Sequence, residues 1–214
     1  MLRTAATGRL RAPARRPPVI EQFLFDLDGT ITRQEILPEI ARAIGVEDEI
    51  AELTARTMAG EFPFESSLRR RVEVLSAVPV SRVREIVAGI EIDPHIEAFL
   101  RENRDRCTIV TGNLDVWIAG LVARLGVPCR SSIAHVRGDR LLGLRHVLDK
   151  AVVAREFSGP ICSIGDGYND LGLMAAADLG VAYGGVHAPA PGLLEVASHA
   201  IFDPQTLCRL LSEW

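Results

Sequence analysis

The chain has 214 residues, of which 48% are hydrophobic and 24% are charged, and this composition is typical of a globular protein. Its length allows one substantial core and a small second domain. The formal net charge of -4 excludes the broad basic face on which nucleic-acid binding depends, so we expect no nucleic-acid partner. No apolar stretch is long enough to cross a bilayer, so we expect no membrane partner either.

The N-terminus and the cysteines indicate the environment of the chain. Residues 1–20 are rich in arginine and contain no acidic residue, so they cannot pack a core, and we expect a flexible basic arm. An organelle-targeting peptide is the alternative, but such peptides are usually rich in serine, which this segment lacks. The four cysteines have neither metal-ligand spacing nor disulfide density. We therefore expect reduced thiols in a cytoplasmic protein, three of them buried: Cys107, Cys129 and Cys162.

The first predicted element is a strand in the apolar run that begins at Phe23. Side chains alternate along a strand, so Asp26 and Asp28 are expected on the same side of its end. Four helices follow, with Gly45 ending the first and Ser81 capping the fourth. They cover residues 35–44, 47–59, 64–77 and 81–88. Because no strand interrupts them, residues 33–89 are predicted to form an inserted, all-helical cap domain.

From Pro94 onward, helical and strand patterns alternate. The predicted helices cover 95–104, 114–125, 149–157, 169–177 and 204–212. The predicted strands cover 107–111, 160–165 and 179–183, with short strands around 136–144 joined by a turn at Gly138 and Asp139. Such a pattern predicts an α/β core, residues 21–32 and 90–214, built as a Rossmann-like doubly wound parallel sheet. Ligands of these sheets bind beyond the carboxyl ends of the strands.

The first strand ends in a pair of carboxylates. Like charges this close raise each other's pKa or need a counter-ion. Asp26 and Asp28 therefore make chemical sense if one stays ionised beside a divalent metal while the other moves protons. A solvated acidic turn is the alternative.

Two further strand ends carry polar residues. The second strand ends in Thr111-Gly112-Asn113, a hydroxyl and free amides before a helix, which is the kind of site that binds phosphate. The third ends in Gly165-Asp166-Gly167-Tyr168-Asn169-Asp170. Each segment alone could be a plain turn. Four acids on one sheet would repel one another, however, so we expect a hard cation such as Mg²⁺, with Lys150, the only lysine of the chain, nearby.

These segments resemble, in order, the four motifs of the haloacid dehalogenase superfamily. The resemblance runs from Phe23 to the C-terminus, and the helical insertion is similar to that of its phosphatase branch. It implies that Asp26 is the nucleophile that forms an aspartyl-phosphate and that Asp28 is the general acid and base. It also implies that Mg²⁺ is held by Asp26, Asp166 and the backbone carbonyl of Asp28. The other implied roles are phosphoryl stabilisation by Thr111 and Lys150, and support of the site by Asn169 and Asp170.

Within the cap, residues 35–42, 58–60 and 64–72 resemble the phosphoserine phosphatase family. The resemblance implies that Glu35 binds a substrate ammonium, that Arg71 binds a carboxylate, and that Met58 and Phe64 close the pocket. The helical pattern independently places Arg71 among apolar neighbours, where it needs an anionic partner, whereas Arg69 lies one turn from Glu65. An internal salt bridge of Arg71 within the cap is the alternative.

The residues Gly112, Asn113 and Asn169 are also expected to contact the substrate. Asn113 departs from the Ser-Gly-Gly common in that family, and the segment from His135 to Lys150 is shorter. The leading hypothesis is a Mg²⁺-dependent phosphomonoesterase that acts on O-phosphoserine or a related small phosphorylated amino acid. The alternatives are a phosphatase or phosphotransferase for another small phosphorylated hydroxy acid or metabolite, and a non-catalytic phosphometabolite sensor. The oligomeric state is left open.

Overall fold

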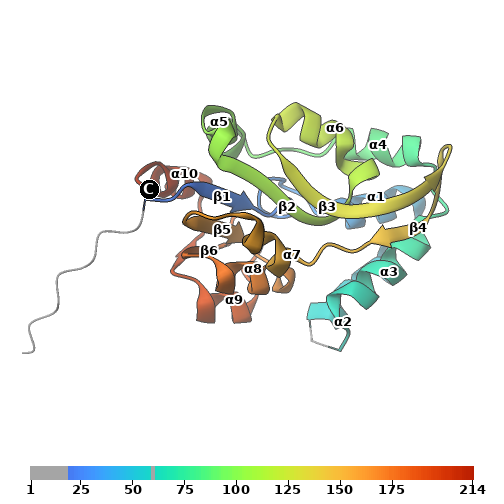
Figure 1. Ribbon diagram of the computed structural model, residues 1–214. Helices are drawn as coiled ribbons and strands as arrows, with labels where there is room; N and C mark the ends of the chain where they lie inside the picture. Colours follow the sequence, from blue (N-terminus) through green and yellow to red (C-terminus); the bar gives the residue numbers. More distant parts are fainter. Residues whose placement is uncertain (1–18, 59–60) are drawn as a thin grey trace, which may run out of the picture.

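The computed structural model describes residues 19–58 and 61–214, with the side chain of Met58 excluded. Its centre is a seven-stranded sheet in the order β4-β3-β2-β1-β5-β6-β7 (Figure 1). All neighbouring strands are parallel except β3 and β4. The strands are β1 (Gln22–Phe25), β2 (Cys107–Leu114), β3 (Cys129–Arg137), β4 (Arg140–His146), β5 (Ile161–Gly165), β6 (Leu179–Tyr183) and β7 (His199–Ile201).

Helices cover both faces of this sheet, as the sequence predicts for a doubly wound fold (Figure 1). One face carries α5 (Pro94–Glu102), α6 (Asp115–Leu125) and α10 (Pro204–Ser212), and the other carries α7 (Lys150–Val153), α8 (Leu171–Ala176) and α9 (Pro191–Val196). Because side chains alternate along β1, Phe23 and Phe25 enter the core on the first side, while Leu24 enters a second core with Val153 and Leu173. No helix in the described ranges is both long and apolar enough to cross a membrane.

The cap consists of four helices inserted between β1 and α5. They are α1 (Ile36–Ile44), α2 (Glu47–Met58), α3 (Phe64–Leu75) and α4 (Val80–Ala88). Within the described part of residues 36–88 there is no strand. The two segments that join cap and core run antiparallel and pair at Thr32 and Ile92, and the Arg33 amide donates to the Glu91 carbonyl at 2.9 Å. The helical cap therefore leaves and re-enters the core through one paired connection.

Several predicted boundaries differ from the observed ones. The predicted short strands near 136–144 are parts of the long strands β3 and β4, and β3 lies parallel to β2. Its residues alternate irregularly between buried and exposed positions, which hides the strand pattern. The strand β7 and the helix α9 were not predicted, because both are short and lie in a segment rich in Gly, Ala and Pro. Short 3-10 helices lie at or near the predicted helix boundaries in three places: Arg104–Arg106, Ala154–Glu156 and Tyr168–Asp170.

The predicted N-cap role of Ser81 is wrong. Helix α4 begins at Val80, after Pro79, and its cap comes from the β3–β4 turn instead. The Asp139 carboxylate accepts hydrogen bonds from the Ser81 amide at 2.7 Å and from the Ser81 hydroxyl at 2.6 Å, and the Asp139 carbonyl accepts from the Val80 amide at 2.9 Å. The hairpin of the core therefore supplies the first turn of a cap helix with its acceptors.

Residues 19 and 20 of the expected N-terminal arm are described, and so are all four cysteines. The arm, residues 1–20, lies outside the described residues up to position 18. Ile20 is buried, and its amide donates to the Trp214 carbonyl at 3.2 Å. The four cysteines, all described, are free thiols. Cys107 and Cys162 are buried as predicted, whereas Cys129 is only half-buried because β3 faces solvent along part of its length.

Candidate active site

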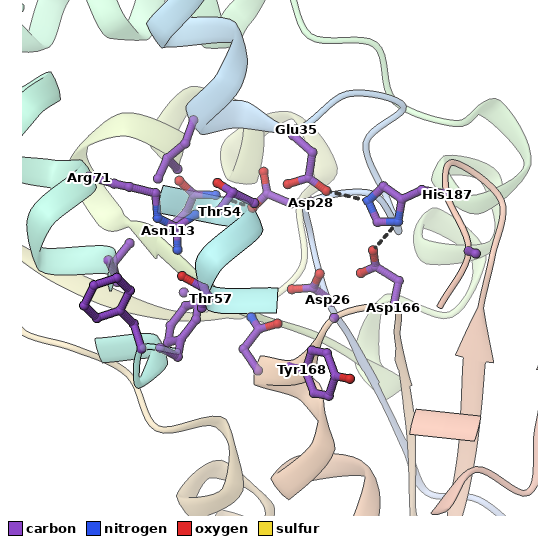
Figure 2. A pocket seen from close by; sticks show the side chains of 18 residues that line it. Asp26, Asp28, Glu35, Thr54, Thr57, Arg71, Asn113, Asp166, Tyr168 and His187 are labelled. Atoms are coloured by element: carbon purple, nitrogen blue, oxygen red, sulfur yellow. Dashed lines mark hydrogen bonds and ion pairs between the residues drawn. The ribbon is translucent and has the colours of Figure 1, made fainter. Parts of the chain in front are cut away.

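A cavity of about 730 Å³ lies between the carboxyl ends of the central strands and the cap helices (Figure 2). Core residues from the loops after β1, β5 and β6 and from the end of β2 meet cap residues from α1 to α3 around it. Its lining consists of Asp26, Asp28, Glu35, Leu37, Thr54, Thr57, Phe62, Phe64, Leu68, Arg71, Gly112, Asn113, Asp166, Gly167, Tyr168, Asn169, His187 and Ala188. Thr111, Lys150 and Asp170, which were predicted for the same site, are buried outside this lining.

The end of β1 brings its two acids to the cavity. The Asp26 amide still donates to the Ile164 carbonyl of β5 at 2.8 Å, so Asp26 continues the sheet. Three residues later Gly29 adopts a positive φ of 68°, which only glycine accepts without strain. A side chain at this position would also collide with Asp166, at 2.9 Å. Asp26 and Asp28 therefore line the cavity together, as predicted.

Lys150 lies buried beside this acid pair. Its ammonium donates to Asp26 and, at 2.6 Å, to Asp170 Oδ1. Burial by itself lowers the pKa of Lys150, but the two carboxylates outweigh burial and raise it, so the side chain is charged. The other oxygen of Asp170 accepts from the amides of Asp166 and Gly167, at 3.2 and 3.1 Å. Asp170 is thus fully engaged and fixes both the ammonium and the loop after β5.

The charge of Lys150 does not balance the negative charge of the buried carboxylates Asp26 and Asp166. Burial, followed by the charge of Asp170, raises the pKa of Asp26 to about 7 even though Lys150 opposes the shift. Burial and the neighbouring acids raise the pKa of Asp166 to about 10. Ligand oxygens of Asp26, Asp166 and Asp170 all lie within 4.8 Å of one another. This donor set of hard oxygens fits a divalent cation such as Mg²⁺, with Asp26 and Asp166 as the two carboxylates of the set that line the cavity.

The carboxyl group of Asp28 is held by one donor from the cap and one from β2. Its Oδ1 accepts from the Ile36 amide, the first residue of α1, at 2.8 Å, and its Oδ2 accepts from the side-chain amide of Asn113. Burial, followed by the charges of Glu35 and Asp26, raises the pKa of Asp28 well above its ordinary value. A buried carboxyl group with a raised pKa is suited to carry a proton, whereas Asp26 is paired with an ammonium.

The strand β2 is longer than the predicted strand, which ended at residue 111. The residues Thr111, Gly112 and Asn113 belong to the strand, which continues to Leu114 with an irregularity in its pairing to β3. The Asn113 amide is not free, because it donates to Thr111 Oγ1 at 3.1 Å. Gly112 is packed against the cap: a Cβ added there would meet Cζ of Phe64 at 2.6 Å. A longer strand thus carries these residues further toward the cap than a turn would.

Cap residues close the cavity from the other side. Arg71 has no salt-bridge partner among the described residues, and its Nε is buried without a hydrogen bond. Burial lowers the pKa of Arg71, although Asp28 and Glu35 act against the shift. The described part of the cap therefore forms no internal salt bridge with Arg71, whereas Arg69 pairs with Glu65 at 2.7 Å as predicted. The side chain of Met58, at the end of α2, lies outside the described residues.

His187, in the loop between β6 and α9, was missed by sequence reasoning. Its Nε2 lies 2.8 Å from Glu35 Oε1 and its Nδ1 lies 3.0 Å from Asp166 Oδ2, so the ring connects the cap entrance to the core (Figure 2). The hydrogen bond with Glu35 raises the pKa of His187. No local pattern marks this histidine, because its two partners are distant in sequence. Tyr168, which also lines the cavity, was part of a predicted motif but had no predicted role.

Comparison with known proteins agrees with this arrangement of strand ends. A family model of the haloacid dehalogenase-like hydrolases matches residues 23–175. The chain belongs to the haloacid dehalogenase-like hydrolases. This assignment confirms the superfamily that the four sequence motifs predicted, and the fold class agrees with it.

Proteins named phosphoserine phosphatases are among those similar to this chain. The chain is 30% identical over 179 residues to the one of Saccharomyces cerevisiae, and the match covers 75% of this chain and 58% of that protein. It is 28% identical over 180 residues to the one of Methanocaldococcus jannaschii, covering 75% and 84%. A solved phosphoserine phosphatase with an analogue of the phospho-aspartyl intermediate matches with a TM-score of 0.78 at 27% identity, covering 91% of this chain and 98% of that one. The chain thus spans little more than half of the yeast relative.

Proposed function

We propose that this haloacid dehalogenase-like hydrolase is a Mg²⁺-dependent phosphomonoesterase that hydrolyses O-phosphoserine or a closely related phosphorylated amino acid. One observation carries the proposal: the β1 acid pair faces the same cavity as Arg71, which has no salt-bridge partner among the described residues and whose Nε is buried without a hydrogen bond. The first suits phosphoryl transfer, and the second suits a small substrate that carries a carboxylate. The similarity to proteins named phosphoserine phosphatases supports the same substrate class.

The chemistry follows from the two acids. A carboxylate oxygen of Asp26 attacks the phosphorus, the ester bond to the alcohol oxygen breaks, and Asp28 gives its proton to that oxygen. Asp28 then takes a proton from water, which attacks the phosphorus and frees Asp26. Asp26, Asp166 and the carbonyl of Asp28 would hold Mg²⁺, which when bound neutralises charge on the phosphoryl oxygens. Lys150 and Thr111 would stabilise the same oxygens from beneath.

The cap, which we assign to residues 33–89, would recognise the amino-acid part of the substrate. Arg71 would bind the carboxylate through parallel hydrogen bonds, and Glu35 would accept the ammonium. Met58 and Phe64 would close over the substrate, while Gly112, Asn113 and Asn169 would border it on the core side. One observation favours a second candidate, a phosphorylated hydroxy acid without an ammonium: His187 already occupies an oxygen of Glu35.

A phosphate-release assay with Mg²⁺ tests the proposal. O-phosphoserine should be hydrolysed with a much higher kcat/KM than sugar phosphates, and phosphoglycerate in the same panel tests the second candidate. Asp26→Asn should abolish turnover because the amide is a poor nucleophile. Asp105→Asn, an exposed change outside the site, is the control and should leave turnover unchanged. Persistent activity of the Asp26→Asn variant would refute the assignment of the nucleophile, and a preference for sugar phosphates would refute the substrate class.

A further inference from the structure

The hydrogen bonding of Asn113 is unusual for a buried amide. The residue is 3% exposed, yet its Oδ1 has no hydrogen-bond partner in the described structure. Its backbone amide is satisfied by Thr111 Oγ1 at 3.1 Å. Its side-chain amide has a single protein partner, Oδ2 of Asp28, 85 positions earlier in the chain. Burying an amide with an unpaired oxygen is unfavourable, so local packing alone does not account for this side chain.

The same contact completes a clamp on Asp28. The Ile36 amide, from the cap, holds Oδ1 at 2.8 Å, and Asn113, from the core, holds Oδ2. In Figure 2 the Asp28 carboxyl lies beside the Asn113 side chain. Two donors on different oxygens fix the plane of a carboxyl group, whereas one donor leaves it free to rotate about its last torsion. Without Asn113, therefore, no described residue of the core would donate a hydrogen bond to this carboxyl.

We propose that Asn113 is a positioning residue that holds the Asp28 carboxyl in the orientation from which it protonates the leaving alcohol. The inference rests on the proposed function, and it replaces direct substrate binding as the main task of Asn113. The step itself is unchanged: the ester bond breaks and the Asp28 proton moves to the alcohol oxygen. Asn113 acts through Asp28, so its loss should matter most where the leaving group needs that proton.

Two aryl phosphates of similar shape test this role. Phenyl phosphate and p-nitrophenyl phosphate both lack ammonium and carboxylate groups, but nitrophenolate leaves readily without a proton and phenolate does not. The parameter to compare is kcat/KM, because it includes only the steps through departure of the alcohol. Asn113→Ala should lower kcat/KM for phenyl phosphate by roughly tenfold or more and for p-nitrophenyl phosphate by less than about threefold. In an Asp28→Asn background, Asn113→Ala should not change the ratio further.

The outcomes separate the alternatives. Equal losses for both aryl phosphates, or none, would overturn the positioning role. A loss confined to O-phosphoserine would also overturn it, because that pattern belongs to a residue that binds the amino-acid part. Asn113→Ser provides the same comparison if the alanine variant does not fold, and Asn103→Ala, an asparagine outside the site, is the matched control. A wild-type chain that hydrolyses none of the three phosphates would overturn the proposed function and this role with it.

Discussion

Lys150 is the only lysine of the chain, and its ammonium lies buried between the carboxylates of Asp26 and Asp170. The planar guanidinium of arginine, which is used almost everywhere else in this sequence, does not have the shape of a compact ammonium between two acids. The residue therefore has two tasks at once. It compensates buried negative charge in the folded protein, and it would face the phosphoryl group from beneath during turnover.

Replacing this lysine should destabilise the protein strongly. Lys150→Met keeps most of the volume but leaves two buried carboxylates without their cation, and we expect the free energy of unfolding to fall by about 3–5 kcal/mol. Denaturant unfolding with a chelator present measures the loss, and Mg²⁺ should restore part of it because the cation neutralises the same acids. Arg82→Met removes an exposed pair with Glu85 and should change stability little. An equally small change for Lys150→Met would show that the buried pair is not formed.

At the scale of elements, the hydrogen-bond acceptors at the start of a helix can come from a residue distant in the sequence. The helix α5 has its own cap, because Asp93 accepts from the amides of His95 and Ile96. The helix α4 has none, and Asp139 of the β3–β4 turn takes its place. The core hairpin and the cap are therefore connected through a helix terminus as well as through the paired linkers.

The Asp139 contact should contribute to stability in a pH-dependent way. Hydrogen bonds from Ser81 lower the pKa of Asp139 below its ordinary value of 3.8. A carboxyl group with a depressed pKa stabilises the fold above the unfolded-state value and loses that contribution as the pH falls through the folded-state value. Asp139→Ala should therefore lower Tm near neutral pH, and the difference from wild type should shrink below about pH 3.8.

Thermal unfolding followed by circular dichroism at several pH values measures this difference. Asp105→Ala, which removes an exposed carboxylate without a side-chain hydrogen bond in the described structure, should leave Tm unchanged throughout. A constant difference between Asp139→Ala and wild type from neutral to acidic pH would contradict the charged cap.

At the scale of the whole molecule, the cap closes directly onto the end of a core strand. Phe64, the first residue of α3, lies against the backbone of Gly112 in β2, where a Cβ would approach its ring to 2.6 Å. Two bodies that share one cavity must meet without a gap if water is to be excluded from it. Glycine at this position allows that close approach.

Gly112→Ala should therefore disturb the pocket more than the fold. The Phe64 ring is the end of a flexible side chain and can swing aside, so we expect little change in stability but a fall in kcat/KM for O-phosphoserine of roughly tenfold or more. Adding Phe64→Ala should make the glycine substitution nearly neutral. The matched control is Gly120→Ala in α6, where a Cβ meets no atom within 4 Å. It should raise stability by about 1 kcal/mol without affecting kcat/KM, and an equal effect of both substitutions on kcat/KM would rule out the contact.

The sequence by itself determined the class of fold and the location of the site. The strands β2 and β5 are buried along their whole length, and their mostly apolar starts, Cys107–Val110 and Ile161–Ile164, can be recognised as strands without a structure. The amphipathic pattern of the cap helices is equally local. Since parallel strands end at one edge, the acids of Asp26, Asp28 and Asp166 could be placed together from their positions after predicted strands.

Only the tertiary structure decided how these side chains pair. Asn113 meets Asp28 across 85 positions, and His187 meets Glu35 across 152. Ser81 was expected to cap its helix, but its hydroxyl instead donates to Asp139, 58 positions away. Periodicity and turn chemistry depend on neighbours within a few residues, whereas these contacts depend on strand register, loop length and the closure of the cap on the core. Those quantities result from packing of the whole chain, and no local pattern encodes them.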